Sequence, residues 1–206
     1  SLEVFLNPDR LIIGFDKPYV KKVLTKILNK ITNNLIWISI PAAEMAKHSI
    51  NAFLATSVVF ANEIASLCEK VGADAKQVEK ALKSDFRIGE YAYLGPGGPY
   101  AGGTLARDVV YLNKIGKDFG TSLPLISNIS VSNNHHKEWV LRNINENDKK
   151  KFKKLLIMGI IYKEGTNTLR RSYAIELAQN PDLLLELKNK LNDKILRSDF
   201  FNSSIF

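Results

Sequence analysis

The stretch AEMAKHSINAFLATSVVFANEIASLCEKVGAD, residues 43–74, decides how this chain folds. Pro41 stands just before it, where a helix can begin without losing a backbone hydrogen bond, and Gly72 provides a natural C-terminal stop. We therefore expect one uninterrupted helix from 41 to about 71, on the order of 45 Å long at ~1.5 Å per residue. Its apolar residues cover more than one side of the helix, which predicts burial on several sides and, in a small chain, a partner subunit.

Residues 11–40 show a strand–helix–strand pattern. LIIGF (11–15) and LIWISI (35–40) are short apolar runs, and between them apolar residues recur at helical spacing from 19 to 31. Two parallel strands leave both edges of a sheet uncovered, so this piece cannot be a domain by itself. We expect it to be an incomplete α/β unit.

Downstream of the long helix the pattern remains mainly helical. Asp74 and Gln77 form a capping pair that opens a helix running to about Lys83. Further elements follow in this order: a glycine-rich loop at 85–104, helices at about 105–118 and 122–146, a buried-type strand at 153–160, and a helix from about Thr168. The predicted fold class is therefore mainly α, with α/β pieces at both ends.

The composition is that of a soluble globular protein, with 45% hydrophobic and 24% charged residues. The single cysteine, Cys68, excludes an internal disulfide and favours a reducing, cytoplasmic compartment. No signal peptide opens the chain and no unbroken apolar run reaches ~18 residues, so we expect no membrane span. Five lysines at 148–154 contribute to a net charge of +8. Aromatic residues do not interleave with these lysines, which argues against nucleic-acid binding.

The segment PGGPYAGGTLARD, residues 96–108, has the glycine content of a loop whose backbone approaches a ligand closely. Gly102, Gly103 and three neighbouring glycines would expose backbone amides, and Tyr100 would supply a ring for stacking. Arg87 and Arg107 would supply fixed positive charge for phosphates. The residues alone leave open whether this is a binding loop or a flexible surface loop.

Three blocks of the sequence together resemble the UDP-glucose/GDP-mannose (nucleotide-sugar) dehydrogenase family. Residues 43–74 resemble its central helix, which carries a lysine and an asparagine four positions apart. SDFRIG (84–89) and the 96–108 segment resemble its RIG and P-G-P-G-Y/F-G-G-S-C-F-P-K-D motifs. GIIYKEGTNTLRRS (159–172) resembles G-L-A-F-K-x-x-T-D-D-x-R-x-S, so that the resemblance extends over about 1–175.

The resemblance implies three parts. Residues 1–40 would be the tail of an NAD-binding Rossmann domain, and 41–147 a central helical dimerisation domain of the 6-phosphogluconate-dehydrogenase type. Residues 148–206 would begin a nucleotide-sugar-binding domain. The resemblance also implies NAD as cofactor, a nucleotide sugar as substrate and a homodimer joined through the 41–72 helix. No G-x-G-x-x-G follows a strand, so we expect this chain alone to be inactive.

The resemblance further implies roles for single residues. Lys47 and Asn51 would bind the substrate and stabilise oxyanions that develop during its oxidation, for which an ammonium and an amide donor are suited. Without the resemblance, the same pair is typical of a snorkelling lysine and an asparagine that packs between helices. Lys163 and Arg170 match positions that hold the nucleotide sugar.

The resemblance places Thr104 where the family has its catalytic cysteine, Arg107 where it has a lysine, and Asp108 where it has an aspartate. A threonine hydroxyl is a far poorer nucleophile than a thiolate. Two hypotheses follow: the protein performs only the first two-electron oxidation of the sugar alcohol, or it is a non-catalytic module for dimerisation or sugar-nucleotide binding. Asp108 would either orient a water or proton carrier or cap the helix that follows the loop. Cys68, in the middle of the long helix, is expected to pack rather than to react.

Overall fold

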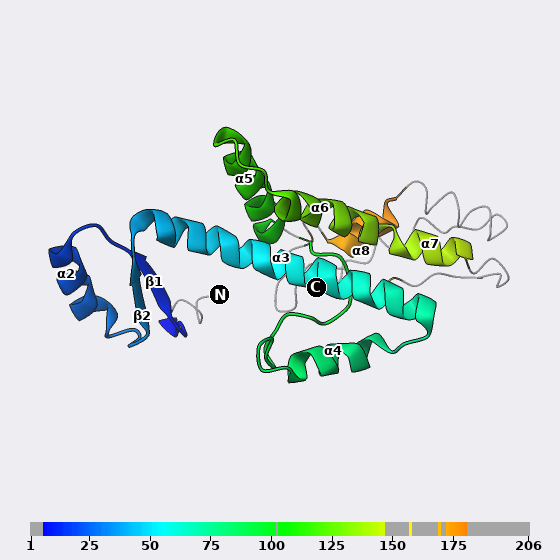
Figure 1. Ribbon diagram of the computed structural model, residues 1–206, viewed down its shortest axis with the longest axis horizontal. Coiled ribbons are helices and arrows are strands. Elements are labelled where there is room, and N and C mark those ends of the chain that lie inside the picture. Colours follow the sequence, from blue (N-terminus) through cyan, green and yellow to red (C-terminus); the bar gives the residue numbers. More distant parts are fainter. Residues whose placement is uncertain (1–5, 102, 147–156, 158–168, 170–171, 181–206) are drawn as a thin grey trace, which may run out of the picture. The chain divides into compact units, whose positions relative to one another are not determined.

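The computed structural model of the chain describes residues 6–101, 103–146, 157, 169 and 172–180 (Figure 1). Its elements in chain order are β1 Leu11–Gly14, α2 Pro18–Leu28, β2 Leu35–Ile38, α3 Ile40–Val71, α4 Ala75–Ser84, α5 Thr104–Asp118, α6 Pro124–Lys137, α7 Trp139–Glu146 and α8 Tyr173–Ala178. The prediction of a mainly α chain with an α/β piece at its start is confirmed. The α/β piece predicted at the other end lies largely outside the described residues. The chain divides into two compact units, Ser1–Phe53 and Leu54–Phe206, with the division inside α3.

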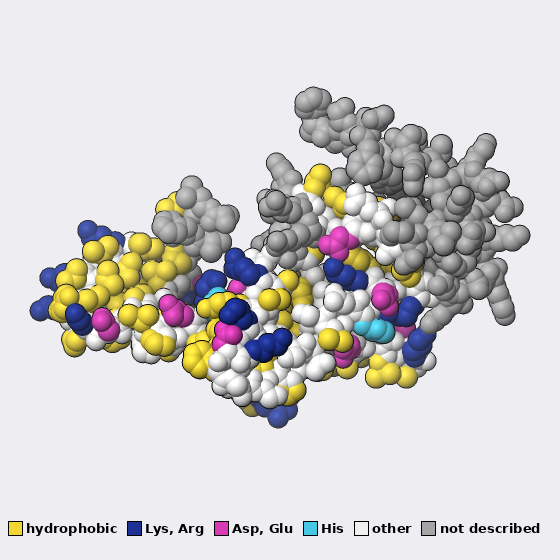
Figure 2. All heavy atoms as spheres, turned by 90° about the horizontal axis from the view of Figure 1, so that it is seen from above, with side chains coloured by type: hydrophobic (Ala, Val, Ile, Leu, Met, Phe, Trp, Pro, Cys, Tyr) yellow, Lys and Arg dark blue, Asp and Glu magenta, His cyan; other side chains and the backbone are white. Residues whose placement is uncertain are grey.

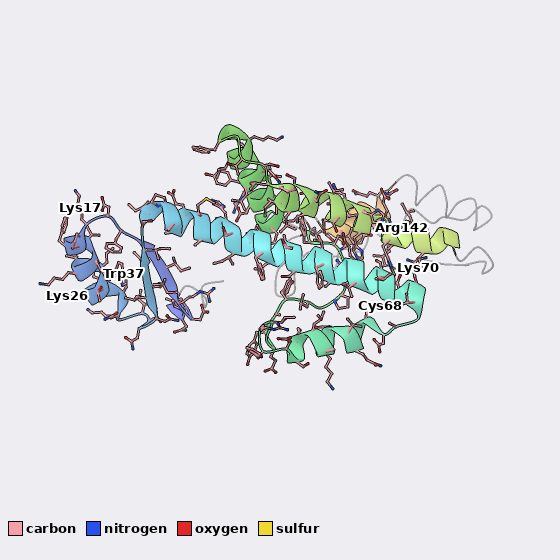
Figure 3. The ribbon with its side chains drawn as sticks, in the orientation of Figure 1. Lys17, Lys26, Trp37, Cys68, Lys70 and Arg142 are labelled. Carbon is pink, nitrogen blue, oxygen red and sulfur yellow. The ribbon has the colours of Figure 1, made fainter. Side chains whose placement is uncertain are left out.

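The first unit contains the predicted strand–helix–strand piece. β1 and β2 pair in parallel, with Leu11 opposite Leu35. Trp37, labelled in Figure 3, belongs to β2. Phe15 and Trp37 meet edge to face with ring centroids 5.6 Å apart, and the Lys21 ammonium of α2 lies within cation–π distance of both rings. These contacts place α2 against one face of the two-stranded sheet.

The sheet of the first unit ends where the long helix begins. A Cβ added to Gly14 would lie 2.8 Å from the Cα of Ile40, so a side chain at this position would displace the helix start. Both α2 and β2 end two to three residues earlier than the sequence pattern predicted, because α3 already begins at Ile40 and residues 29–31 form a turn. Boundary differences of this size are common at fraying helix ends.

Hydrophobic side chains gather on the surface of the first unit, with lysines at its margin (Figure 2). Tyr19, Val23 and Ile27 recur every four residues along α2 and are each more than half exposed. A contiguous apolar stripe of this length is uncommon on the solvent-exposed surface of a soluble monomer. That this α/β piece is incomplete stays a prediction.

The predicted long helix is confirmed as α3, and Gly72 ends it in the left-handed region at a φ of +72°. With a mean hydropathy of 1.4 over 18 residues, α3 is long and apolar enough to cross a membrane by length and composition alone. Its polar residues nevertheless bond to other elements of the second unit: Asn62 to the glycine-rich loop, Glu63 to Ser132 of α6, and Glu69 to Trp139. Hydrogen bonds to several other elements are typical of a helix at the centre of a folded unit.

The capping pair at the start of α4 is confirmed. Asp74 accepts a hydrogen bond from the backbone N–H of Lys76 at 2.8 Å, and the Gln77 amide donates to the same carboxylate at 3.2 Å. The carboxylate thus satisfies one of the helix's free backbone donors. Gln77 supports the cap through the aspartate side chain.

The prediction of one helix over 122–146 is wrong, because the segment forms two helices, α6 and α7, separated at Glu138. The break has a tertiary cause. The indole N–H of Trp139 donates to both carboxylate oxygens of Glu69, at 3.2 and 3.0 Å, and the Arg142 guanidinium donates to the carbonyl of His135 at 2.8 Å. The Glu69 partner lies 70 residues away in sequence, so it is not visible in the local pattern, which has no proline or glycine at the break.

A small cluster joins α8 to the preceding helices. Leu177 is buried against Val140, Leu141, Ile157 and Tyr173, and the Tyr173 hydroxyl donates to the carbonyl of Lys137 at 2.7 Å. The helix that the sequence placed from about Thr168 begins at Tyr173. The predicted strand at 153–160 lies, apart from Ile157, outside the described residues.

Candidate functional site

A pocket of about 540 Å³ lies beside the glycine-rich loop in the second unit. Its volume is in the range of small-molecule sites, roughly 300–1,000 Å³. The pocket is lined by one face of α3, the start of α4, the loop itself, and the ends of α6, α7 and α8. The residues of these walls on which the site depends are Asn62, Ser66, Cys68, Glu69, Pro96–Pro99, His136, Trp139 and Tyr173.

A second hollow, of about 490 Å³, lies over α4 and is a weaker candidate. It is lined by Lys76, Glu79, Lys80, Lys83, Ser84 and Glu90, most of them on one helix. The Lys83 ammonium is bonded to Glu79 at 2.6 Å. Because only one helix and a single loop residue form it, we take the pocket beside the glycine-rich loop as the candidate site.

Asn62 of α3 holds the glycine-rich loop at one end. Its carboxamide oxygen accepts from the N–H of Gly97 at 2.9 Å, and its amide nitrogen donates to the carbonyl of Gly98 at 3.2 Å. The His136 ring nitrogen Nε2 lies 2.8 Å from the carbonyl of Gly97, which requires that nitrogen to be the donor. Asn62 is 1% exposed, so this side chain belongs to the interior of the unit.

Asn133 of α6 holds the loop three residues further on. Its carboxamide accepts from the N–H of Tyr100 at 2.9 Å and donates to the carbonyl of Tyr100 at 3.2 Å. Asn133 and Tyr100 are both buried. The stacking surface that the sequence assigned to the Tyr100 ring is therefore small in this conformation.

The Arg87 guanidinium, which the sequence predicted to bind phosphate, is already paired with Asp85. The guanidinium donates to both carboxylate oxygens of Asp85, at 3.0 and 2.6 Å, and the Arg87 backbone N–H donates to the same carboxylate at 2.9 Å. These bonds lower the pKa of Asp85 and raise the pKa of Arg87. The side chain of Arg87 is 76% exposed, and its charge is offset by Asp85 in this conformation.

Thr104, Arg107 and Asp108 share the first two turns of α5. At positions i, i+3 and i+4 they lie on one side of the helix. Thr104 is exposed, whereas Asp108 is fully buried and accepts from Arg107 Nε at 3.2 Å. Gly103 occupies the N-cap position, and Asp108 therefore lies inside the helix rather than at its cap.

The remaining predicted site residues fall into two groups. Lys47 and Asn51 lie one turn apart on α3 in the first unit, with Lys47 exposed and Asn51 half-buried. Gly102, Lys163 and Arg170 lie outside the described residues. None of the predicted site residues that the structure describes lines the pocket; these residues are Lys47, Asn51, Arg87, Tyr100, Gly103, Thr104, Arg107 and Asp108.

Sequence reasoning missed Asn62, Asn133 and Trp139. Asn62 carried a signal, since it follows Asn51 by eleven residues, close to three helical turns, in an otherwise apolar stretch. A polar residue on such a face indicates a specific partner. Nothing local marks Asn133, which lies in the polar run SNNHHK.

Residues 41–135 match the UDP-glucose/GDP-mannose dehydrogenase family, central domain. The UDP-glucose 6-dehydrogenase of Rickettsia bellii is 35% identical over 185 residues, covering 87% of this chain and 42% of that protein. The UDP-glucose 6-dehydrogenase of Rhizobium meliloti is 32% identical over 187 residues, again covering 87% of this chain and 42% of that protein. The chain thus spans less than half the length of these curated relatives.

The fold is shared with a solved structure, a UDP-glucose dehydrogenase from Pyrobaculum islandicum. The TM-score is 0.79 at 23% identity, over 93% of this chain and 47% of that one. At this identity the likeness shows the fold alone. The family resemblance inferred from the three sequence blocks is confirmed by these matches.

Proposed function

Because residues 41–135 form the central domain of the UDP-glucose/GDP-mannose dehydrogenase family, we propose that the chain is the central part of an NAD-dependent nucleotide-sugar 6-dehydrogenase and binds the nucleotide sugar beside its glycine-rich loop. One observation supports this above others. The loop of this domain forms a wall of a pocket of about 540 Å³ and is held there by buried side chains of two helices. A loop that only covers the surface needs no such attachment.

The proposed chemistry assigns oxyanion stabilisation to Lys47 and Asn51. An ammonium and a carboxamide held one helical turn apart suit an alkoxide that develops as the sugar alcohol loses hydride. Asp108, buried beside Arg107, would orient a water or a proton carrier. We also propose the domain organisation expected from the sequence, with 1–40, 41–147 and 148–206 as its three parts.

Thr104 limits the proposed reaction to one oxidation. Covalent capture of the aldehyde needs a strong nucleophile, and a hydroxyl at neutral pH requires a dedicated base to serve as one. We therefore expect the complete enzyme to form one NADH per sugar. A coupled measurement of NADH against sugar acid and aldehyde checks this, and two NADH per sugar would contradict the assignment of Thr104 to the nucleophile position.

The described residues do not fit a dinucleotide cofactor. The turn after β1 runs through Phe15, Asp16 and Lys17, and only Ser39 separates β2 from α3. Neither turn offers the glycine-rich phosphate loop that opens a helix in dinucleotide-binding folds. We therefore propose that NAD binds to other residues of the enzyme. We also propose that the enzyme is cytoplasmic.

The partner proposed for this chain is a second copy. Phe53, Phe60 and Leu67 recur every seven residues along α3 and are 72%, 45% and 59% exposed. Ile50 and Val71 extend the same stripe at heptad spacing and are also exposed. An exposed apolar stripe at heptad spacing is typical of helices that pack against another helix.

Binding of UDP-glucose to the purified chain tests the proposal. Isothermal titration should give saturable binding for which UDP competes. Ser66 lines the pocket on α3, and Ser66→Phe should weaken binding at least tenfold by filling it. Ser122→Phe, in the exposed turn between α5 and α6, is the matched control. Absence of saturable binding of both UDP-glucose and GDP-mannose would overturn the proposed function.

The alternative, a non-catalytic dimerisation or sugar-nucleotide-binding module, is favoured by Thr104 alone. A binding module predicts the same binding and the same dimer but no oxidation by the complete protein, whereas a dimerisation module predicts the dimer alone. The NADH measurement therefore separates the two functions, since zero turnover with intact binding supports the module.

A further inference from the structure

The glycine-rich loop is attached to the helices through its backbone. Three side chains, Asn62, Asn133 and His136, bond to five backbone groups of residues 97–100: the N–H and C=O of Gly97, the C=O of Gly98, and the N–H and C=O of Tyr100. The distances lie between 2.8 and 3.2 Å. They are those of ordinary N–H···O hydrogen bonds.

The two carboxamides are buried far more deeply than asparagines usually are. Asn62 is 1% exposed and Asn133 is 3% exposed. Burial of an amide is costly unless its groups are bonded. Each carboxamide uses its oxygen and its nitrogen on the loop, so each would lose two bonds if the loop moved away.

The pairing at Tyr100 fixes the backbone direction as well as its position. One carboxamide accepts from the N–H and donates to the C=O of the same residue, as a neighbouring strand would. Asn62 instead bridges two successive residues, because it accepts from the N–H of Gly97 and donates to the carbonyl of Gly98. Glycine backbones have the largest conformational freedom to lose, so these are the positions where such restraint has most effect.

We propose that Asn62, Asn133 and His136 are positioning residues that hold loop 97–100 in its ligand-binding conformation before the nucleotide sugar arrives. The inference rests on the proposed function and adds a mechanism to it. Binding to a preformed wall avoids the entropic cost of ordering the loop at that moment. Asn133 does not line the pocket and acts through the loop alone, whereas Asn62 and His136 hold the loop and also line the pocket.

Near-isosteric substitutions test the proposal in the full chain. Asn62→Leu and Asn133→Leu each remove both bonds. We expect the hydrogen-exchange protection factor of the Gly97 amide in the first variant, and of the Tyr100 amide in the second, to fall at least tenfold. The dissociation constant for UDP-glucose should rise about tenfold in each, since ordering even one residue on binding has an effect of that size.

Asn113→Leu is the matched control. Asn113 is also partly buried, and its amide donates to the carbonyls of Val109 and Ile126 while its oxygen accepts from Ser127. It therefore joins α5 to α6 without contacting the loop in any of these bonds. Asn113→Leu should lower global stability but leave loop protection and UDP-glucose affinity within twofold of wild type.

Recovery of UDP-glucose affinity on protonation of an introduced aspartate distinguishes a positioning role from a packing role. In Asn133→Asp, an ionised carboxylate cannot donate to the Tyr100 carbonyl, whereas the protonated acid can. Relative to wild type at each pH, UDP-glucose affinity should be weak at pH ~8 and recover toward pH ~5, because burial raises the pKa of such a carboxyl. Asn113→Asp should show no comparable recovery.

His136→Phe provides a variant that keeps the fold if the asparagine variants fail to fold. The ring remains to pack near Trp139, with which His136 now lies at a centroid distance of 6.5 Å, and only the donor to Gly97 is lost. We expect a smaller effect, about threefold weaker UDP-glucose binding, with His136→Gln restoring part of it by supplying an amide donor.

The outcomes separate the two proposals. Unchanged loop protection in the variants overturns the positioning role, as does lowered protection with unchanged UDP-glucose affinity. If wild-type chain binds neither UDP-glucose nor GDP-mannose, the proposed function fails, and amide exchange alone decides whether these side chains hold the loop.

Discussion

Tyr173 is the residue whose ionisation reports most directly on the second unit. Burial raises its pKa, the charge of Glu176 raises it further, and Arg142 opposes both. The folded state therefore prefers the neutral phenol, with a pKa above the unfolded value of about 10. Its contribution to stability is fully present below pH ~10 and is lost as pH rises through the folded pKa.

Tyr173→Phe removes the hydroxyl bonded to the Lys137 carbonyl. We expect a loss of about 1 kcal/mol of unfolding free energy at neutral pH, and a flatter stability profile above pH ~10. Urea unfolding at neutral and alkaline pH checks both effects. Tyr91→Phe is the control, because Tyr91 is 96% exposed; an equal effect there would contradict the role of the buried hydroxyl.

At the scale of elements, the junction of α5 and α6 depends on one glycine. A Cβ at Gly116 would lie 2.7 Å from Leu123 Cδ1 and 3.0 Å from the carbonyl oxygen of Thr121. Overpacking of this kind costs ~1–3 kcal/mol, and the better helix propensity of alanine returns up to ~1 kcal/mol. We therefore expect Gly116→Ala to destabilise the second unit by about 1 kcal/mol in urea unfolding.

The double variant Gly116→Ala/Leu123→Ala tests the cause of that loss. If the clash with Leu123 is responsible, the two substitutions should be less destabilising together than the sum of their separate effects. Gly98→Ala serves as the control, since nothing lies within 4 Å of its added Cβ. Simple additivity would place the cause in the backbone at Thr121 instead.

Elements with strong local signals were predictable from the sequence. α3 is bounded by Pro41 and Gly72, and α4 by the Asp74 cap, so local chemistry alone determines where they begin or end. The break at Glu138 was not predictable, because its cause is the contact of Trp139 with Glu69, 70 residues away in sequence. Local periodicity carries no information about such a partner.

The candidate site was predictable only in part, for the same reason. Glycine content and motif spacing identified the loop, but not what holds it. The bonds from Asn62 and Asn133 to the loop span 35 and 33 residues, and a single sequence gives no measure of such pairings. The Asp85 partner of Arg87, two residues away, was within reach of local reasoning and was missed.

At the scale of the whole molecule, the exposed heptad stripe of α3 predicts the oligomeric state. Phe60→Glu places a charge in the middle of that stripe, where desolvation in a helix–helix interface would be costly. We expect light scattering after size exclusion to give a dimer for the wild-type chain and a monomer for the variant. Val23→Glu, at a more exposed apolar position on α2, should remain dimeric; a monomeric wild type would contradict the stripe as an interface.

The two tryptophans of the chain are distributed one to each compact unit. Trp37 lies against Phe15 and Lys21 in the first, and Trp139 lies in the pocket wall with its indole bonded to Glu69 in the second. Each unit therefore carries its own intrinsic fluorophore. Trp37→Phe leaves an emission signal that reports on melting and ligand quenching in the pocket-bearing unit alone, and Trp139→Phe leaves one that reports on the sheet.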